Sequence, residues 1–217
     1  MPKSAVVLFD LDGTVIDSTE AIVESFHVSF KHFGDALPPE RAIVSGIGHP
    51  LKTMFEQLGV DPARSDDYVA VYRGHYRTVC NDKTFLVPGA KEAVELMAAH
   101  ARLGVVTTKT ARFSWEILKH LGIGDRFETV VGFEEVQNPK PHPEPILLAL
   151  ERLGRPAGQK WMIGDTPMDI LAARAAGVTP LGVLSGYATE AELLRHQCDI
   201  FDNALKACEN IVETLKK

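Results

Sequence analysis

Short apolar runs alternate with helix-like segments through most of the chain from about residue 84 onward. Strand-like runs lie at 102–107, 128–132, 160–164 and 178–184, with a weaker one at 198–201. Segments with helical periodicity lie between and after them, near 89–100, 111–121, 143–153, 167–176, 188–196 and 203–216. This alternation is typical of a parallel sheet with helices on both faces. We therefore predict an α/β fold with a doubly wound parallel sheet, in which the wholly apolar run 5–9 is an interior strand.

Residues 15–83 contain no strand-like run and have helical periodicity instead. Apolar side chains recur there at helical spacing, at Ile22, Phe26, Phe30 and Phe33. Asp17 and Glu20 precede this stripe with the spacing of a capping box. Further helices are expected near 39–45, 50–58 and 63–80. The pattern predicts a core domain of residues 1–14 and 84–217, with a smaller all-helical domain of residues 15–83 inserted after the first strand.

Composition limits the partners of this chain. Its 217 residues carry a net charge of −6 and no long basic run, so nucleic-acid binding is not expected. The N-terminal apolar run is too short for a signal peptide or a membrane span. The three cysteines are too few and too scattered for a disulfide framework or a zinc site, and they indicate reduced thiols. We expect a cytoplasmic protein that binds no membrane, and the sequence leaves both a monomer and a homodimer open.

Polar residues follow several of the predicted strands, at the point where each strand ends. In an open parallel sheet, ligands bind beyond the carboxyl ends of the strands. The polar residues at or after these ends, or in the loop 137–145, are Asp10, Asp12, Thr107, Thr108, Lys109, Lys140, Asp165 and Asp169. All of them are expected at one edge of the sheet, and Asp165 is also expected to cap the helix that follows it.

Three of these acids have the chemistry of a magnesium site. Asp10, Asp165 and Asp169 supply the hard carboxylate oxygens that Mg²⁺ prefers. The charge of a bound metal ion would also allow neighbouring carboxylates to remain ionised side by side. We therefore predict Mg²⁺ as the cofactor.

The remaining polar residues fit phosphoryl transfer. Asp10 could attack a phosphoryl group in line and form an aspartyl-phosphate. Asp12 could protonate the leaving oxygen and then activate water. Lys140, Thr107 and backbone amides near Thr108 could bind the phosphoryl oxygens, where transition-state charge is stabilised.

The four motifs, taken in their order along the chain, resemble the haloacid dehalogenase (HAD) superfamily. They are D-x-D-G-T-V at 10–15, the strand that ends in Thr107, Lys140 before a helix, and G-D-T-x-x-D at 164–169. The resemblance implies a Rossmann-like core and a helical cap domain at 15–83. It also implies that Asp10 is the nucleophile, that Asp12 is the acid/base, and that Thr107 and Lys140 bind phosphate. By the same resemblance, Mg²⁺ is bound by Asp10, the backbone carbonyl of Asp12, Asp165, and Asp169 directly or through water.

Within the superfamily, several segments are similar to phosphoglycolate phosphatases, namely 86–97, 104–109, 139–145, 161–177 and 185–189. The cap segment 45–55 also resembles that of pyrophosphatase-like members. We expect a Mg²⁺-dependent phosphatase for a small anionic phosphomonoester, with phosphoglycolate as the first choice. Pyrophosphate hydrolysis, sugar-phosphate hydrolysis and a phosphoglucomutase are alternatives with the same catalytic residues. A receiver-type regulator that accepts a phosphoryl group belongs to a different class, as does an inactive binding module.

The predicted cap offers several basic residues that could contact the rest of a substrate. Most of them are expected on solvated helix faces. His49 and Lys52 are favoured as substrate contacts because the glycine-flanked loop 46–50 could approach the core. Lys52 could alternatively form a Schiff base, as in phosphonoacetaldehyde hydrolase relatives.

Overall fold

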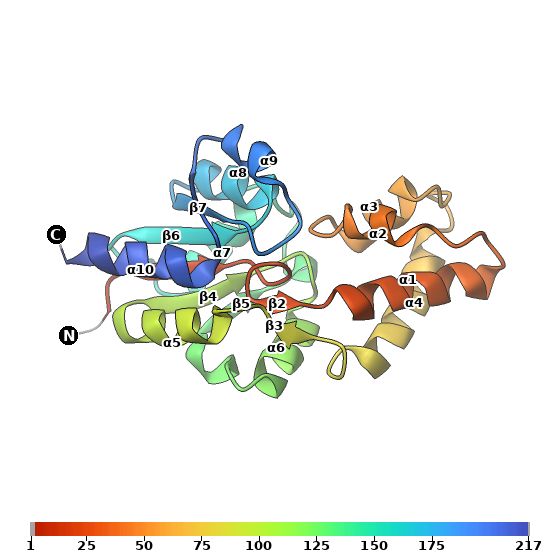
Figure 1. Cartoon of the computed structure of the whole chain (residues 1–217), viewed down its shortest axis with the longest axis horizontal. Coiled ribbons are helices and arrows are strands. Elements are labelled where there is room, and N and C mark those ends of the chain that lie inside the picture. The colour runs from red at the N-terminus through yellow and green to blue at the C-terminus, as the bar shows by residue number, and fades with distance from the viewer. Residues whose placement is uncertain (1–2, 217) are drawn as a thin grey trace. The chain divides into compact units, whose positions relative to one another are not determined.

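The computed structural model describes residues 3–216 of the chain (Figure 1). Within this range the chain divides into two compact units. One unit comprises the described residues up to Asp17 and from Leu86 onward, and the other is Ser18–Phe85. The chain passes between the units at two short strands, β2 (Ile16–Asp17) and β3 (Phe85–Leu86), which pair with each other.

The first unit is built on a parallel sheet of six strands, as the sequence predicts. Its strands are β1 (Val6–Phe9), β4 (Arg102–Val106), β5 (Thr129–Val131), β6 (Lys160–Gly164), β7 (Thr179–Val183) and β8 (Asp199–Phe201). They are arranged in the order β5-β4-β1-β6-β7-β8, and every neighbouring pair is parallel. Strand β1 lies in the interior, and Phe9 is level with Val105 on one side and Ile163 on the other. The ends of β1, β4 and β6 are therefore at the same edge of the sheet.

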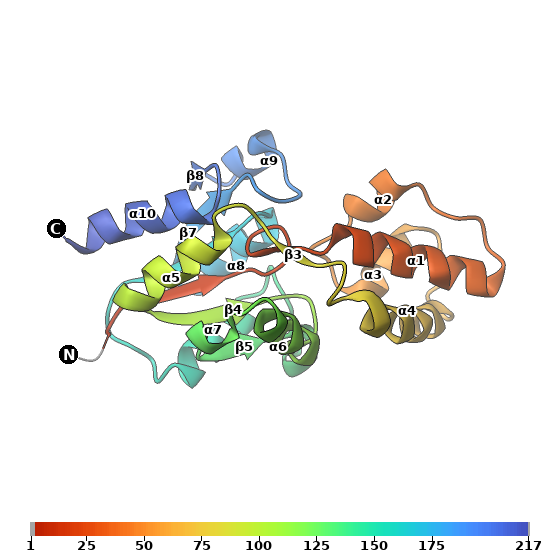
Figure 2. The same ribbon diagram turned by 60° about the horizontal axis from the view of Figure 1, so that its bottom comes forward.

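Helices follow the strands and cover the sheet (Figures 1 and 2). They are α5 (Ala90–His100), α6 (Ala111–His120), α7 (Glu144–Arg152), α8 (Pro167–Ala175), α9 (Glu190–Leu194) and α10 (Ala204–Leu215), with single 3₁₀ turns at Gly124–Arg126 and Phe133–Glu135. Helices α5 and α10 pack side by side, and α7 and α8 pack on β4–β7. Val6 and Leu8 of β1 belong to the same buried cluster as Ile146 of α7 and Ala172 of α8. A strand that is buried on both faces accounts for the unbroken apolar run at residues 5–9.

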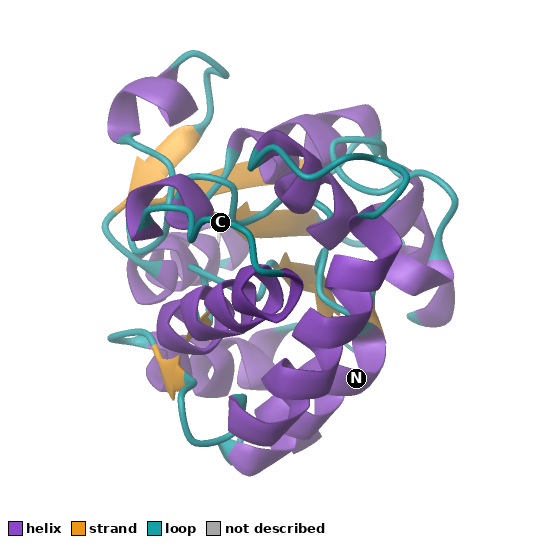
Figure 3. Ribbon diagram, turned by 90° about the vertical axis from the view of Figure 1, so that its right-hand side faces the viewer, coloured by secondary structure: helices purple, strands orange, loops and turns teal. Residues whose placement is uncertain are grey.

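The second unit is helical (Figure 3), and its core is rich in aromatic side chains. Its helices are α1 (Thr19–Phe33), α2 (Glu40–Val44), α3 (Leu51–Gln57) and α4 (Ser65–Val79). Phe26 of α1 lies 4.4 Å from Phe55 of α3 and 5.1 Å from Tyr72 of α4, measured between ring centroids. Such aromatic pairs stabilise a core beyond their buried area alone. Phe26 and Phe30 lie on the buried face of α1. Phe33 is half-buried and stacks on Tyr68.

The predicted capping box at Asp17 and Glu20 is wrong. Helix α1 begins at Thr19 with Ser18 at the N-cap position. Asp17 is instead the last residue of β2, so its backbone belongs to a strand and lies one position too early to cap α1.

Candidate active site

The loop after β1 carries Asp10 and Asp12 and turns back sharply. The backbone N–H of Asp10 still donates to Ile163 O of β6 at 2.8 Å, which extends the sheet by one residue. The amides of Val15 and Ile16 then both donate to Leu11 O, at 2.9 and 3.0 Å. Asp10 is therefore held by the sheet, and Asp12 lies in the turn that follows it.

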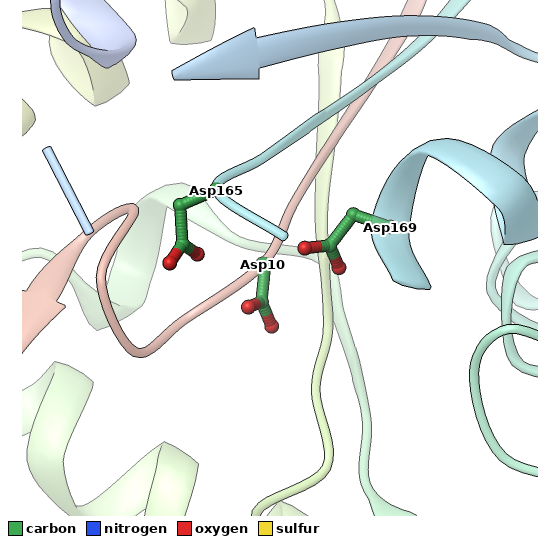
Figure 4. Close-up of side chains that lie close together, drawn as sticks. All are labelled: Asp10, Asp165 and Asp169. Atoms are coloured by element: carbon green, nitrogen blue, oxygen red, sulfur yellow. The ribbon is translucent and has the colours of Figure 1, made fainter. Parts of the chain in front are cut away.

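Three buried carboxyl groups meet beyond the strand ends. Asp10 follows β1, Asp165 follows β6, and Asp169 lies in the first turn of α8. One oxygen from each lies within 4.8 Å of the others, and Figure 4 shows the three side chains gathered at one point. Asp10 is 4 % exposed, and Asp165 and Asp169 are fully buried. Buried carboxyl groups this close together remain ionised only beside a compensating positive charge, and otherwise keep a proton.

Lys140 supplies part of that compensation. Its Nζ donates to Asp10 Oδ1 at 2.7 Å, to Asp169 Oδ1 at 2.6 Å and to Val106 O at 3.1 Å. Burial opposes the charged ammonium, but the attraction of Asp10 and Asp169 outweighs it and raises the pKa of Lys140 above its ordinary value. The loop that carries Lys140 thus reaches the ends of both β1 and β4.

One ammonium does not balance three carboxylates. Burial, together with repulsion from Asp169, raises the pKa of Asp10 well above its usual range, although Lys140 opposes the rise. Burial and the same repulsion raise the pKa of Asp165 to about 7. With all three acids ionised, the cluster carries two surplus negative charges, which is the charge of one divalent cation. The donor set of carboxylate oxygens suits a hard cation.

Asp165 is held on both of its oxygens. Thr14 Oγ1 donates to Oδ1 at 3.0 Å, and the backbone N–H of Tyr187 donates to Oδ2 at 2.9 Å. Two glycines make room for this carboxyl group. A Cβ added at Gly13 would lie 2.4 Å from Asp165 Oδ2, and one at Gly186 would lie 2.0 Å from the same oxygen. Gly13 also has a φ of +83°, which favours glycine.

Asp169 both joins the cluster and begins helix α8. Its Oδ2 accepts from Thr166 Oγ1 at 2.7 Å and from Thr166 N at 3.0 Å, as part of a capping box. Its Oδ1 accepts from Lys140. The N-cap of α8 is Thr166 and not Asp165, so the prediction that Asp165 caps this helix is wrong. Asp165 lies one residue too early, and Thr14 and Tyr187 hold its carboxyl group instead.

Asp12 faces a different lysine from Asp10. Its Oδ2 lies 3.2 Å from Lys109 Nζ, and both side chains are about nine-tenths buried. Lys109 follows β4, and its backbone N–H donates to Thr107 Oγ1 at 3.1 Å. Thr107 is buried, whereas Thr108 is half-buried.

Comparison with known proteins identifies the family of this chain. A family model described as haloacid dehalogenase-like hydrolase matches residues 7–183. The chain belongs to this family.

It is 36 % identical over 198 residues to pyrophosphatase PpaX of Bacillus pumilus, covering 89 % of each chain. It is 32 % identical over 197 residues to a phosphoglycolate phosphatase of Colwellia psychrerythraea, covering 86 % of this chain and 87 % of that one. A solved haloacid dehalogenase-like hydrolase from Streptococcus pneumoniae superposes with a TM-score of 0.85 at 29 % identity, covering 95 % and 97 % of the two chains.

The chain is thus a phosphatase of the haloacid dehalogenase-like family. Four residues predicted from the sequence, Asp10, Asp165, Asp169 and Lys140, meet in the buried cluster of this hydrolase. Among the described residues, no helix has both the length and the apolar character needed to cross a membrane.

Sequence reasoning gave no role to several residues that hold the site of this hydrolase. Thr14, Thr166 and the backbone amide of Tyr187 fix the two acids that follow β6. Thr14 stands inside the first motif, which is the signal that could have identified it. Lys109 was placed at the correct sheet edge, but its pairing with Asp12 has no signature in the sequence.

The two cap candidates have partners inside the helical unit. His49 is half-buried, and its Nδ1 lies 3.2 Å from Gly46 O. Lys52 Nζ donates to Asp66 Oδ2 at 2.9 Å on an exposed surface. Their contact with a substrate remains a prediction.

Proposed function

We propose that this hydrolase is a Mg²⁺-dependent phosphatase that cleaves a small anionic phosphomonoester through a phosphorylated Asp10. Phosphoglycolate is the first substrate to test. The observation that carries the proposal is the buried cluster of Asp10, Asp165 and Asp169, in which Lys140 pairs with Asp10 and Asp169. A structural salt bridge needs no third carboxylate, whereas a site for a divalent cation needs this surplus of negative oxygens.

The residues present fit a bound Mg²⁺ ion. Asp10 and Asp165 would hold it with the backbone carbonyl of Asp12, and Asp169 would ligate directly or through water. The two surplus negative charges of the cluster match the charge of the ion. When bound, the ion would supply positive charge at the site of phosphoryl transfer.

In the first step a carboxylate oxygen of Asp10 attacks phosphorus, so that an O–P bond forms as the bond from phosphorus to the leaving oxygen breaks. The leaving oxygen takes a proton from Asp12 and departs as an alcohol. Lys140 holds Asp10 in place through its 2.7 Å hydrogen bond. Its ammonium and the Thr107 hydroxyl stabilise the charge on the phosphoryl oxygens.

In the second step water replaces the alcohol. Asp12, now a carboxylate, takes a proton from the water as its oxygen attacks phosphorus. The O–P bond to Asp10 breaks, and inorganic phosphate leaves. Asp12 therefore has to reach two different oxygens in turn. It gives a proton to the leaving oxygen and later takes one from water, while Asp10 remains fixed.

A substrate panel tests the proposal. Phosphate release is measured with phosphoglycolate, pyrophosphate, glucose phosphates and p-nitrophenyl phosphate, with Mg²⁺ and with EDTA. Pyrophosphate belongs in the panel because of the relative named pyrophosphatase PpaX. A mutase would move the phosphoryl group to a sugar hydroxyl and release little phosphate.

The covalent route is tested with Asp10→Asn, and Asp125→Asn on the exposed 3₁₀ turn is the matched control. We expect Asp10→Asn to be inactive and Asp125→Asn to match the wild type. Asp12→Asn should accumulate the phosphorylated enzyme, visible by intact mass, because water is no longer activated. Turnover by Asp10→Asn with Mg²⁺ present would contradict the mechanism, and a phosphorylated wild type without turnover would favour a receiver-type regulator.

A further inference from the structure

The two acids of the first motif, Asp10 and Asp12, pair with different lysines. Lys140 binds Asp10 and Asp169, whereas Lys109 pairs with Asp12 at 3.2 Å. The Lys109 and Asp12 side chains are only 10 % and 11 % exposed. An ion pair that is shielded from water interacts more strongly than one on the surface. Lys109 thus pairs with a different acid of the first motif from Lys140.

The position of Lys109 is unfavourable for the helix beside it. Helix α6 begins at Ala111, two residues after Lys109. A helix N-terminus carries partial positive charge, so a cation there is repelled. The carboxylate of Glu134 accepts from the N–H of Ala111 at 2.9 and 3.2 Å and offsets that charge. Helix stability therefore gives no reason for a lysine at this position.

The backbone of Lys109 is fixed on both sides. Its N–H donates to Thr107 Oγ1 at 3.1 Å, and its carbonyl accepts from the N–H of Phe133 at 3.1 Å. A hydroxyl that accepts from a backbone amide keeps its own proton to donate elsewhere. The same residue therefore orients the Thr107 hydroxyl through its peptide group and contacts Asp12 through its side chain.

We propose that Lys109 is a positioning residue for phosphoryl transfer, which holds the Asp12 carboxyl group where it exchanges a proton with the leaving oxygen. The inference rests on the function proposed above and adds a residue outside the four motifs. The bonds that form and break are those already given, and Lys109 keeps its own protons throughout. Its ammonium acts on the reaction through the Asp12 carboxyl group, which it contacts at 3.2 Å.

The test compares substrates whose leaving groups differ in their need for a proton. An alkyl phosphate needs protonation of its leaving oxygen, whereas p-nitrophenolate leaves without it. Lys109→Met should lower kcat/KM for the alkyl phosphate by about 10- to 100-fold, a part of the usual effect of acid catalysis. For p-nitrophenyl phosphate the loss should stay below about 3-fold, because acid catalysis contributes little there. KM should change little for either substrate.

Three further variants make the result specific. Lys109→Arg keeps the cation and should recover most of the loss. Lys91→Met on the exposed face of α5 is the matched control and should match the wild type. The double variant Lys109→Met/Asp12→Asn should be no slower than Asp12→Asn alone, because both changes act on one proton transfer. Thermal melting of each variant separates loss of fold from loss of positioning.

Two results would overturn the inference while leaving the proposed function standing. One is an equal loss on both substrates through a raised KM, which would make Lys109 a substrate-binding residue. The other is a double variant whose losses multiply, since Lys109 would then act independently of Asp12. If Asp12→Asn itself shows no dependence on the leaving group, Asp12 does not protonate the leaving oxygen and the inference fails, whereas the proposed function is still decided by phosphate release from the substrate panel and by Asp10→Asn.

Discussion

Replacing Lys140 with methionine should strongly destabilise the metal-free protein. The ammonium lies 2.7 Å from Asp10 and 2.6 Å from Asp169 in a buried site. Methionine keeps most of the apolar stem but leaves two buried carboxyl groups without their cation. Removing one partner of a buried ion pair costs about 3–5 kcal/mol. At about 2–4 °C per kcal/mol for a chain of this size, Tm should fall by about 6–20 °C at pH 8 in EDTA.

Lowering the pH should restore part of the stability that Lys140→Met loses. An acid whose pKa is raised in the folded state keeps a proton that the unfolded chain has already released. Its contribution to stability therefore declines as pH rises from the unfolded to the folded pKa. Burial raises the pKa of Asp165 to about 7 and that of Asp10 well above its usual range. Without Lys140 the ionised buried carboxylates destabilise the fold more strongly at pH 8. At pH 5 they keep protons, so the Tm difference between the variant and the wild type should be smaller.

Calorimetry or far-UV circular dichroism in EDTA measures both effects. Lys206→Met is the matched control, because Lys206 pairs with Glu209 at 2.9 Å on the surface. Surface pairs contribute little to stability, so the Tm of this variant should stay near that of the wild type. If the two methionine variants melt at the same temperature at pH 8, Lys140 does not balance the buried acids and the reasoning is refuted.

Three further outcomes are expected. Mg²⁺ should raise Tm more at pH 8 than at pH 5.5, because binding requires ionised carboxylates and the pKa of Asp165 is about 7; equal shifts would argue against this acid as a ligand. Gly186→Ala places a Cβ 2.0 Å from Asp165 Oδ2 and should weaken Mg²⁺ binding by about 10-fold or more, measured by calorimetric titration. Gly74→Ala, where nothing lies within 4 Å of the added Cβ, is its control and should bind normally. Phe55→Ala should cost the helical unit about 3–5 kcal/mol in urea unfolding, and a loss below about 1 kcal/mol would contradict its place in the aromatic core.

The meeting of acids at one sheet edge could be predicted because it follows from topology. In a parallel sheet every strand ends at the same edge, so residues after the runs 5–9 and 160–164 had to lie along that edge. How close together they lie depends on the order of the strands. The order of the strands could not be read in this way. It depends on which crossovers pass over which face, and the sequence alone did not show that β6 pairs directly with β1.

Side-chain partners were harder to predict than positions. Lys109 and Lys140 both reach the site edge, and sequence spacing does not show which carboxylate each one meets. That choice depends on the turn after Leu11 and on the rigid backbone of Lys109. The same limit explains the error at the start of α8, where Thr166 and Asp165 are neighbours and only the direction of each side chain distinguishes a cap from a member of the cluster.

The glycines around the acid cluster restrict how this enzyme can be diversified. Added side chains at Gly13 and Gly186 would collide with Asp165, and one at Gly164 would lie 2.3 Å from Asp169. Each of these positions has only one acceptable residue as long as the two acids are retained. A mutagenesis library of this enzyme should therefore hold all three glycines constant.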